Sequence, residues 1–249
     1  MRLRIVATAG YHYDAPTSAS CIEARLFAAS TDRQRVQSTS LECDPSGWKL
    51  SFVDYWGTPT VAVHLREPHD TLALVGTSVV DVEASGPLAP KLSWDDLASD
   101  AVFDAFAEYQ VTDADGVGAD LAVAVAEVRR YAATPLAFAR ALPDVTDPDA
   151  DLLLEELRRA GVPARLVRGL RVDATTLGVG DSVDVEPRVW VEVWDGAWTS
   201  VDPTDGGPCD GHVAFAFGRR RSDLAALRGV YSGEGHSEGY QRVTVRRLG

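Results

Sequence analysis

Cysteine and histidine are the residues of this chain best suited to nucleophilic chemistry, and one pair of them is close in sequence. Cys209 and His212 are three residues apart and could form a nucleophile and its base. Their segment has the composition of a loop that enters a strand, and nothing in the spacing brings the two side chains together. Cys21 and Cys43 are distant in sequence and form no C-x-x-C pair. We therefore expect three reduced, structural thiols and no zinc or redox site.

A run of acidic residues from Asp147 to Asp151 places carboxylates at alternate positions, as calcium-binding loops do. The run lacks the glycine that such a loop requires, and Arg158 stands where the closing glutamate is needed. These acids are better explained as the first turn of a helix, where the helix dipole favours negative charge. We expect no metal site and no cofactor.

The charge and hydropathy of the chain exclude several classes of partner. Its 24 Lys and Arg against 37 Asp and Glu give a net charge of −13, which opposes binding to nucleic acid or anionic lipid. No apolar run approaches the roughly 20 residues of a membrane span, and the residues after Met1 alternate like a strand and not like a signal peptide. We expect a cytoplasmic protein whose partner is a small molecule, a peptide or a basic protein.

Two regions with different patterns predict an α+β fold. Up to about residue 83, short segments alternate apolar and polar residues between turns, which predicts an N-terminal antiparallel β-sandwich. The stretch 84–91 contains one glycine and two prolines and predicts a boundary between a domain at 1–83 and a domain at 92–249.

The second region begins with helices and ends with strands. Ser93 can cap a first helix, and further helices are expected near 121–133 and 136–141. A helix from Asp147 to Gly161 has clear end signals, with Asp147 as N-cap and Gly161 as the stop. The strands expected after it, forming one antiparallel sheet, are 164–172, 188–194, 197–201, 212–217 and 241–247.

Eight short motifs, ordered and spaced along most of the chain, indicate a family. In the first region they are Tyr-His-Tyr-Asp-Ala-Pro from residue 11, Glu-Ala-Arg-Leu from 23, Arg-Gln-Arg-Val from 33 and Val-Asp-Tyr-Trp-Gly-Thr from 53. In the second they are Gly-Val-Pro-Ala-Arg from residue 161, Trp-Val-Glu-Val-Trp from 190, Val-Asp-Pro-Thr from 201 and Arg-Gly-Val-Tyr from 228. Together they resemble the bacterial transglutaminase-like family, which implies an N-terminal β-domain followed by a papain-like transglutaminase core.

The family's chemistry uses a cysteine at a helix N-terminus, a histidine on a strand and an aspartate that orients the histidine. By position in the motifs, Thr146 stands where the cysteine would be, and Arg188 replaces the histidine. Asp202, in the Asp-Pro-Thr motif, is the retained member. The resemblance therefore implies a degenerate triad at Thr146, Arg188 and Asp202.

Thr146 and Arg188 cannot act together as nucleophile and base. A threonine hydroxyl needs an adjacent base, and an arginine with a pKa above about 12 cannot accept a proton near neutrality. Asp202 is expected either to form a structural ion pair with Arg188 or to orient Arg188 for bidentate binding of a carboxylate.

Two functions of different class remain open. The first is a pseudoenzyme that serves as a binding or scaffold partner; since family members occur with ATP-grasp-type amide ligases and with active relatives, the resemblance implies a partner of that kind. The second is a repurposed enzyme that acts on an amide, ester or peptide-like substrate without a cysteine thioester. A filled cleft would favour the first, and a deep pocket with a perturbed titratable group the second.

Overall fold

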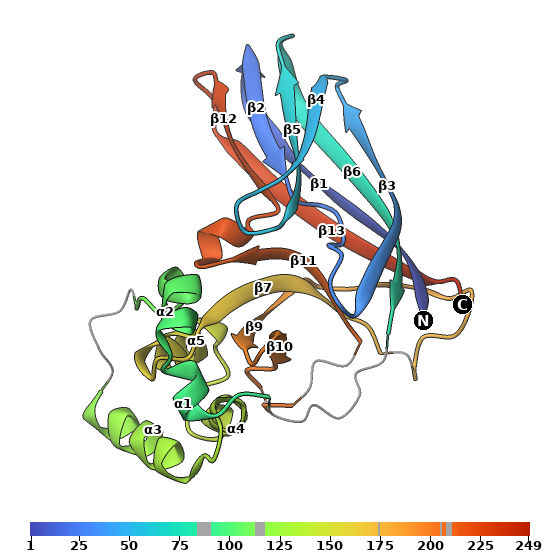
Figure 1. The fold of residues 1–249 in the computed structure, drawn as a ribbon. Coiled ribbons are helices and arrows are strands. Elements are labelled where there is room, and N and C mark those ends of the chain that lie inside the picture. Colours follow the sequence, from blue (N-terminus) through green and yellow to red (C-terminus); the bar gives the residue numbers. More distant parts are fainter. Residues whose placement is uncertain (84–90, 113–117, 174, 205, 208–210) are drawn as a thin grey trace.

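The computed structural model describes residues 1–83, 91–112, 118–173, 175–204, 206–207 and 211–249. Most of the expected link at 84–91 lies outside the described residues, as does Cys209. A β-sandwich forms one end of the molecule, and a second sheet with helices packed on it forms the other (Figure 1). The fold is therefore α+β with antiparallel sheets, as the sequence predicts.

The sandwich consists of two antiparallel sheets around one core. Their strand orders are β3-β6-β1-β13-β8 and β12-β2-β5-β4. Leu3 and Ile5 of β1 are fully buried between more exposed neighbours, which confirms the alternation seen in the sequence. The strands are β1 (Arg2–Thr17), β2 (Ala19–Ala24), β3 (Gln34–Asp44), β4 (Trp48–Val53), β5 (Pro59–Leu65), β6 (His69–Val82), β8 (Ser182–Asp184), β12 (Leu227–Ser232) and β13 (Ser237–Arg247).

The end of the chain returns to the sandwich. β13 pairs with β1 from Leu3 opposite Arg247 to Tyr13 opposite Ser237, and β12 pairs with β2. The expectation that residues 241–247 complete the second sheet is therefore wrong. Alternating polarity identifies a strand but does not select the sheet that it joins. The sandwich thus includes β8, β12 and β13 from outside residues 1–83.

The second sheet separates the helices from the sandwich. Its order is β10-β9-β7-β11. Val191 and Val193 of β9 share a core with Leu153 of the helices, whereas Trp190 packs with Ala29 of the sandwich on the opposite face. The strands are β7 (Ala164–Arg171), β9 (Arg188–Trp194), β10 (Trp198–Val201) and β11 (His212–Gly218).

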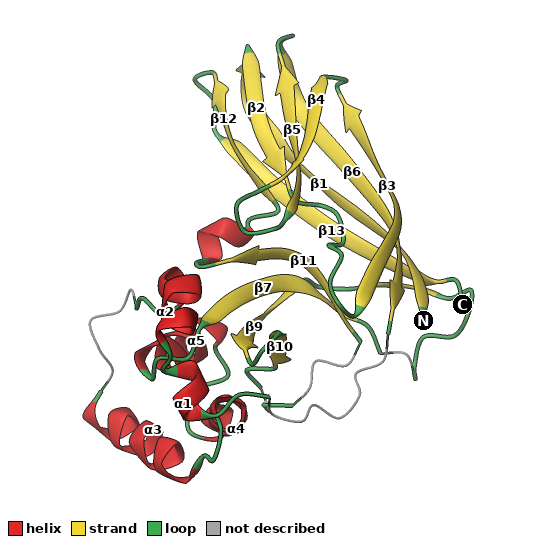
Figure 2. Ribbon diagram, viewed as in Figure 1, coloured by secondary structure: helices red, strands yellow, loops and turns green. Residues whose placement is uncertain are grey.

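The α-helices gather at the end of the molecule away from the sandwich (Figure 2). Ser93 caps the first of them as predicted, with its side chain accepting the Asp96 N–H. No helix of the described residues is long and apolar enough to cross a membrane. The helices are α1 (Trp94–Leu97), α2 (Asp100–Phe106), α3 (Ala119–Tyr131), α4 (Pro135–Ala141) and α5 (Ala150–Arg159), with 3-10 turns η1 (Ala107–Tyr109), η2 (Leu142–Asp144) and η3 (Arg221–Leu224).

Helix α5 begins later than the sequence predicts. Its N-cap is Asp149, not Asp147, and the Asp149 carboxylate accepts the N–H groups of Asp151 and Leu152 at 2.7 and 3.4 Å. The predicted end of the helix is confirmed, because Gly161 adopts a φ of 77°, which favours glycine.

Two buried side chains of the sandwich attach it to β11. The Gln34 carboxamide donates to the carbonyl oxygens of Ala29 and Ala214 and accepts the Ala214 N–H at 2.9 Å. The Thr58 hydroxyl accepts the Phe217 N–H at 2.9 Å and donates to the Phe217 carbonyl oxygen at 3.3 Å. Both side chains thus bind the backbone of β11 much as a neighbouring strand would, and they fix the distance between the sandwich and the second sheet.

A buried arginine makes a further contact between these two parts. Arg168 of β7 donates its Nη2 hydrogen to the Arg25 carbonyl oxygen at 2.6 Å. Burial, with a smaller contribution from the nearby Arg25 charge, lowers the pKa of Arg168 to about 10.

Candidate functional site

Arg188 and Asp202 lie together at one end of the second sheet. Arg188 is the first residue of β9, and Asp202 directly follows β10. Because the two strands are antiparallel, the start of one lies beside the end of the other. Both residues line a cavity of about 230 Å³, here called the strand-end cavity, together with Pro148. Thr146, two residues earlier, is not among the residues that line this cavity.

Thr146 is buried in the turn that precedes α5. It lies four residues before Ala150, the first residue of the helix. Its N–H and its hydroxyl both donate to the Leu142 carbonyl oxygen, at 3.0 and 3.1 Å. The first free N–H groups of α5 are capped by Asp149. Thr146 therefore does not lie at the N-terminus of a helix, where a nucleophile could be activated.

The Asp202 carboxylate is engaged, but not with Arg188. It accepts the Thr204 N–H at 2.9 Å. Its Oδ2 atom lies 3.7 Å from His212 Nε2 and 3.8 Å from Arg171 Nη1. Within the described part of the chain no ion pair joins Asp202 to Arg188, so the expected structural pair is wrong.

Arg188 presents an uncommitted cation to the strand-end cavity. It is exposed, and its side chain has no hydrogen bond or ion pair with any residue that the structure describes. A guanidinium carries five donors in a planar fork that matches a carboxylate. The Arg188 guanidinium is therefore available to bind a carboxylate, but no described contact with Asp202 orients it as expected.

His212 is a functional candidate for which the sequence indicates no partner. It is the first residue of β11, its side chain is 5% exposed, and its ring packs edge-on against Trp190 at 4.8 Å. The structure places it beside Asp202, whereas Cys209, its neighbour in sequence, lies outside the described residues. One sequence feature could have suggested this contact: Asp202 and His212 lie at the two ends of the segment that connects β10 to β11 in the same sheet.

The two described cysteines lie far from this end of the sheet. Cys21 is in β2, with its Sγ atom 3.3 Å from His64 Nε2. Cys43 is in β3, where burial raises the pKa of the thiol. Among the described residues no group of three or more His, Cys, Asp or Glu side chains could hold a metal ion.

A larger cavity of about 540 Å³ lies between the sandwich and the second sheet. We call it the tryptophan cavity, because Trp56 of the sandwich and Trp190, Trp194 and Trp198 of the β9–β10 hairpin line it. Trp190 lines the strand-end cavity as well, so the two cavities are adjacent.

A buried ion pair also lines the tryptophan cavity. The Arg165 guanidinium binds the Glu192 carboxylate with a shortest N–O distance of 2.6 Å. The same guanidinium lies over the rings of Trp198 and Phe217, at 4.2 Å from each centroid. Ser200 donates to the other Glu192 oxygen at 3.2 Å. The charges of this pair are therefore matched within the protein.

Comparisons with known proteins match both the sandwich and the second sheet to one family. The model of the bacterial transglutaminase-like N-terminal region matches residues 3–81, and that of the transglutaminase-like superfamily matches residues 148–203. The uncharacterized protein ML0607 of Mycobacterium leprae (strain TN) is 32% identical over 276 residues, covering 99% of each chain. A crystal structure of a candidate cysteine protease from Cytophaga hutchinsonii is similar over 100% of this chain and 91% of that chain, with a TM-score of 0.59 at 17% identity. At that identity the likeness shows the fold alone.

Proposed function

Because the chain belongs to the transglutaminase-like superfamily and carries its bacterial N-terminal region, we propose that it is a catalytically degenerate member that binds a protein or peptide-like partner. The observation that carries the proposal is the state of Thr146. At the position expected for the nucleophile, this residue is buried and hydrogen-bonded within its own turn.

The chemistry of the remaining positions supports recognition over catalysis. A thioester requires a thiolate, and Cys21 and Cys43 lie in strands of the sandwich. A hydroxyl nucleophile requires a base, and Arg188 stays protonated near neutrality. A free guanidinium at a cavity wall can instead hold a carboxylate of a partner.

The partner class that the family suggests is an ATP-grasp-type amide ligase or an active transglutaminase-like relative. We propose this class and expect co-elution of the purified proteins on size exclusion. Arg188→Ala should weaken the complex, whereas Arg35→Ala, an exposed arginine of β3, should not. Failure of both partner types to co-elute would refute this partner class.

The decisive test of the degenerate state is an activity assay. The purified chain should show no thiol-dependent transamidation or peptidase activity. A triple variant with Cys21→Ser, Cys43→Ser and Cys209→Ser should leave any activity of the protein unchanged. A robust activity that disappears in the triple variant would overturn the proposal.

A second candidate function rests on the 3.7 Å approach of Asp202 to His212. A carboxylate beside an imidazole stabilises the protonated ring, so His212 could take a proton from a water that attacks an amide or ester carbonyl. This is the repurposed enzyme without a thioester. Hydrolysis that His212→Gln abolishes and the triple cysteine variant keeps would establish it, and its absence across amide, ester and peptide substrates would exclude it.

A further inference from the structure

The tryptophan cavity carries a binding chemistry of its own. We propose that it binds a small peptide-like ligand that combines a free carboxylate with a flat apolar side chain. The proposal goes beyond the function proposed above, because it does not involve Thr146, Arg188 or Asp202 and does not require those positions to be inactive.

The size and walls of the cavity fit such a ligand. Its volume of about 540 Å³ is typical of sites that enclose a small molecule. The indoles of Trp56, Trp194 and Trp198 form its aromatic walls. Aromatic walls pack well against flat groups, and the buried Arg165–Glu192 pair adds no unmatched charge.

One buried donor in the wall lacks an acceptor. Trp190 is 2% exposed, and its Nε1 hydrogen has no hydrogen-bond partner among the residues that the structure describes. Buried polar groups in native proteins are almost always paired, because an unpaired one loses its hydration without compensation. Because Trp190 lines the cavity, our proposal is that an acceptor atom of the ligand pairs with this donor.

The charges of the cavity favour an anionic ligand. Lys91 and Arg33 line it, and neither forms an ion pair with a residue that the structure describes. The carboxylate of Glu192 already accepts from Arg165 and Ser200, which leaves Asp32 as the acidic counterpart. Two cations without an ion pair against one acid give this cavity a local positive charge in a chain with a net charge of −13.

The walls are held apart by the protein itself. The hydrogen bonds of Gln34 to Ala214 and of Thr58 to Phe217 fix the sandwich above the second sheet, beside the cavity. A preformed cavity binds its ligand without paying for the ordering of its walls.

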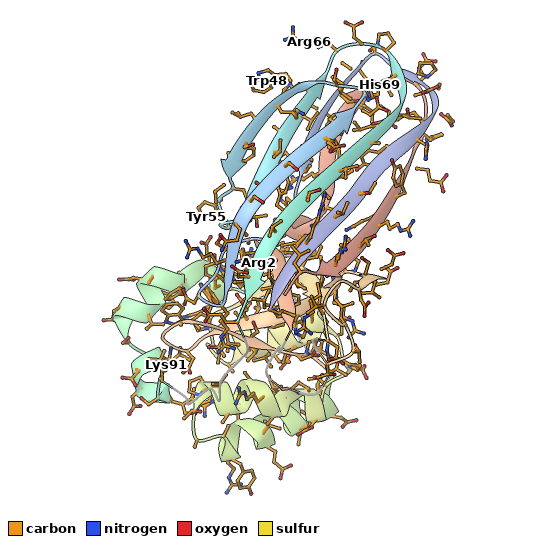
Figure 3. All side chains as sticks on the ribbon, turned by 90° about the vertical axis from the view of Figure 1, so that its right-hand side faces the viewer. Arg2, Trp48, Tyr55, Arg66, His69 and Lys91 are labelled. Atoms are coloured by element: carbon orange, nitrogen blue, oxygen red, sulfur yellow. The ribbon has the colours of Figure 1, made fainter. Side chains whose placement is uncertain are left out.

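Nitrogen-15 NMR of the tryptophan indoles tests the proposal directly. The probes are N-acetyl-L-phenylalanine and its neutral amide, which differ in the carboxylate alone. The carboxylate form should shift the indole N–H signals of the four cavity tryptophans. The signal of Trp48 should not move, because this residue lies on the sandwich far from Lys91 (Figure 3). The neutral amide should bind about tenfold more weakly, as expected for the loss of one charge-assisted hydrogen bond.

Matched double variants distinguish the effect of the two cavity cations from a general effect of the protein's charge. Arg33→Gln with Lys91→Gln should remove the preference for the carboxylate. Arg35→Gln with Lys49→Gln removes the same charge outside the cavity and should keep it. Each of three results would overturn the proposal: equal binding of the two probes, equal losses in both double variants, or no indole shift up to about 10 mM probe.

A last variant tests the donor itself. Trp190→Phe keeps an aromatic ring and removes the N–H group. It should weaken the carboxylate probe about fivefold or more, while the signals of Trp56, Trp194 and Trp198 still respond. Unchanged affinity in Trp190→Phe would show that the unpaired donor does not face the ligand, and the binding mode proposed here would be wrong.

Discussion

Replacing Gln34 by alanine should destabilise the protein strongly, because one side chain supplies three buried hydrogen bonds. Gln34 is 3% exposed and binds Ala29 once and Ala214 twice. The Ala214 carbonyl oxygen keeps a bond from the Ala29 N–H, whereas the Ala214 N–H loses the partner given by Gln34. At about 1 kcal/mol for each bond, Gln34→Ala should lower the free energy of unfolding by about 3 kcal/mol.

Urea unfolding followed by tryptophan fluorescence measures this loss. Gln37→Ala is the matched control, because Gln37 is an exposed residue of the same strand with a single bond to Asp81. The control should change the free energy of unfolding by no more than about 0.5 kcal/mol. A cost below about 1 kcal/mol for Gln34→Ala would refute the role of this side chain as a stabilising link between the sandwich and β11.

Three further predictions concern other parts of the structure. The double variant Thr146→Cys, Arg188→His should show little or no transamidation, because the introduced thiol is buried and does not lie at the N-terminus of α5. A thiol pKa from alkylation well below the ~8.5 of a free cysteine, together with turnover, would contradict this. In the folded protein the pKa of Arg168 is about 10, below its usual value, so above that pH the folded state binds fewer protons than the unfolded state. The free energy of unfolding should therefore rise by about 1 kcal/mol between pH ~9 and ~11, relative to the Arg168→Met variant. Equal pH profiles of the two proteins would argue against the lowered pKa. Gly206→Ala should lower the free energy of unfolding by at least about 2 kcal/mol, measured in urea, because φ is +66° and the new Cβ would lie 1.9 Å from the Arg140 carbonyl oxygen; a neutral change would show that this loop can rearrange.

Local sequence signals predicted the end of α5 correctly but not its start. Gly161 is a single stop signal, and its positive φ confirms it. At the start, Asp147, Asp149 and Asp151 offer three similar capping residues around one proline. Each satisfies the same local rule, so the choice of Asp149 depends on how the turn at Thr146 packs, which is a tertiary contact.

The sequence correctly predicted the strand positions of Arg188 and Asp202 in the candidate site. Motif spacing placed Arg188 at the start of one strand and Asp202 at the end of the next, and the structure has both there. The partner of Asp202 was not predictable in the same way. His212 reaches Asp202 from β11, which is separated from β10 by two other strands in the sheet. Such a contact depends on sheet order, which alternation and spacing do not encode.

In strand β9, the residues that pack in the cores or line the tryptophan cavity are separate from the residue expected to replace the catalytic base. Its odd residues, Val191 and Val193, belong to the core under the helices, so they are constrained by packing. Its even residues Trp190 and Trp194 line the tryptophan cavity. Arg188, the first residue of the strand, is exposed and contributes to neither core. Either a histidine or an arginine at that position is therefore compatible with the packing of β9 and with the cavity, which supports the proposed change from catalysis to binding.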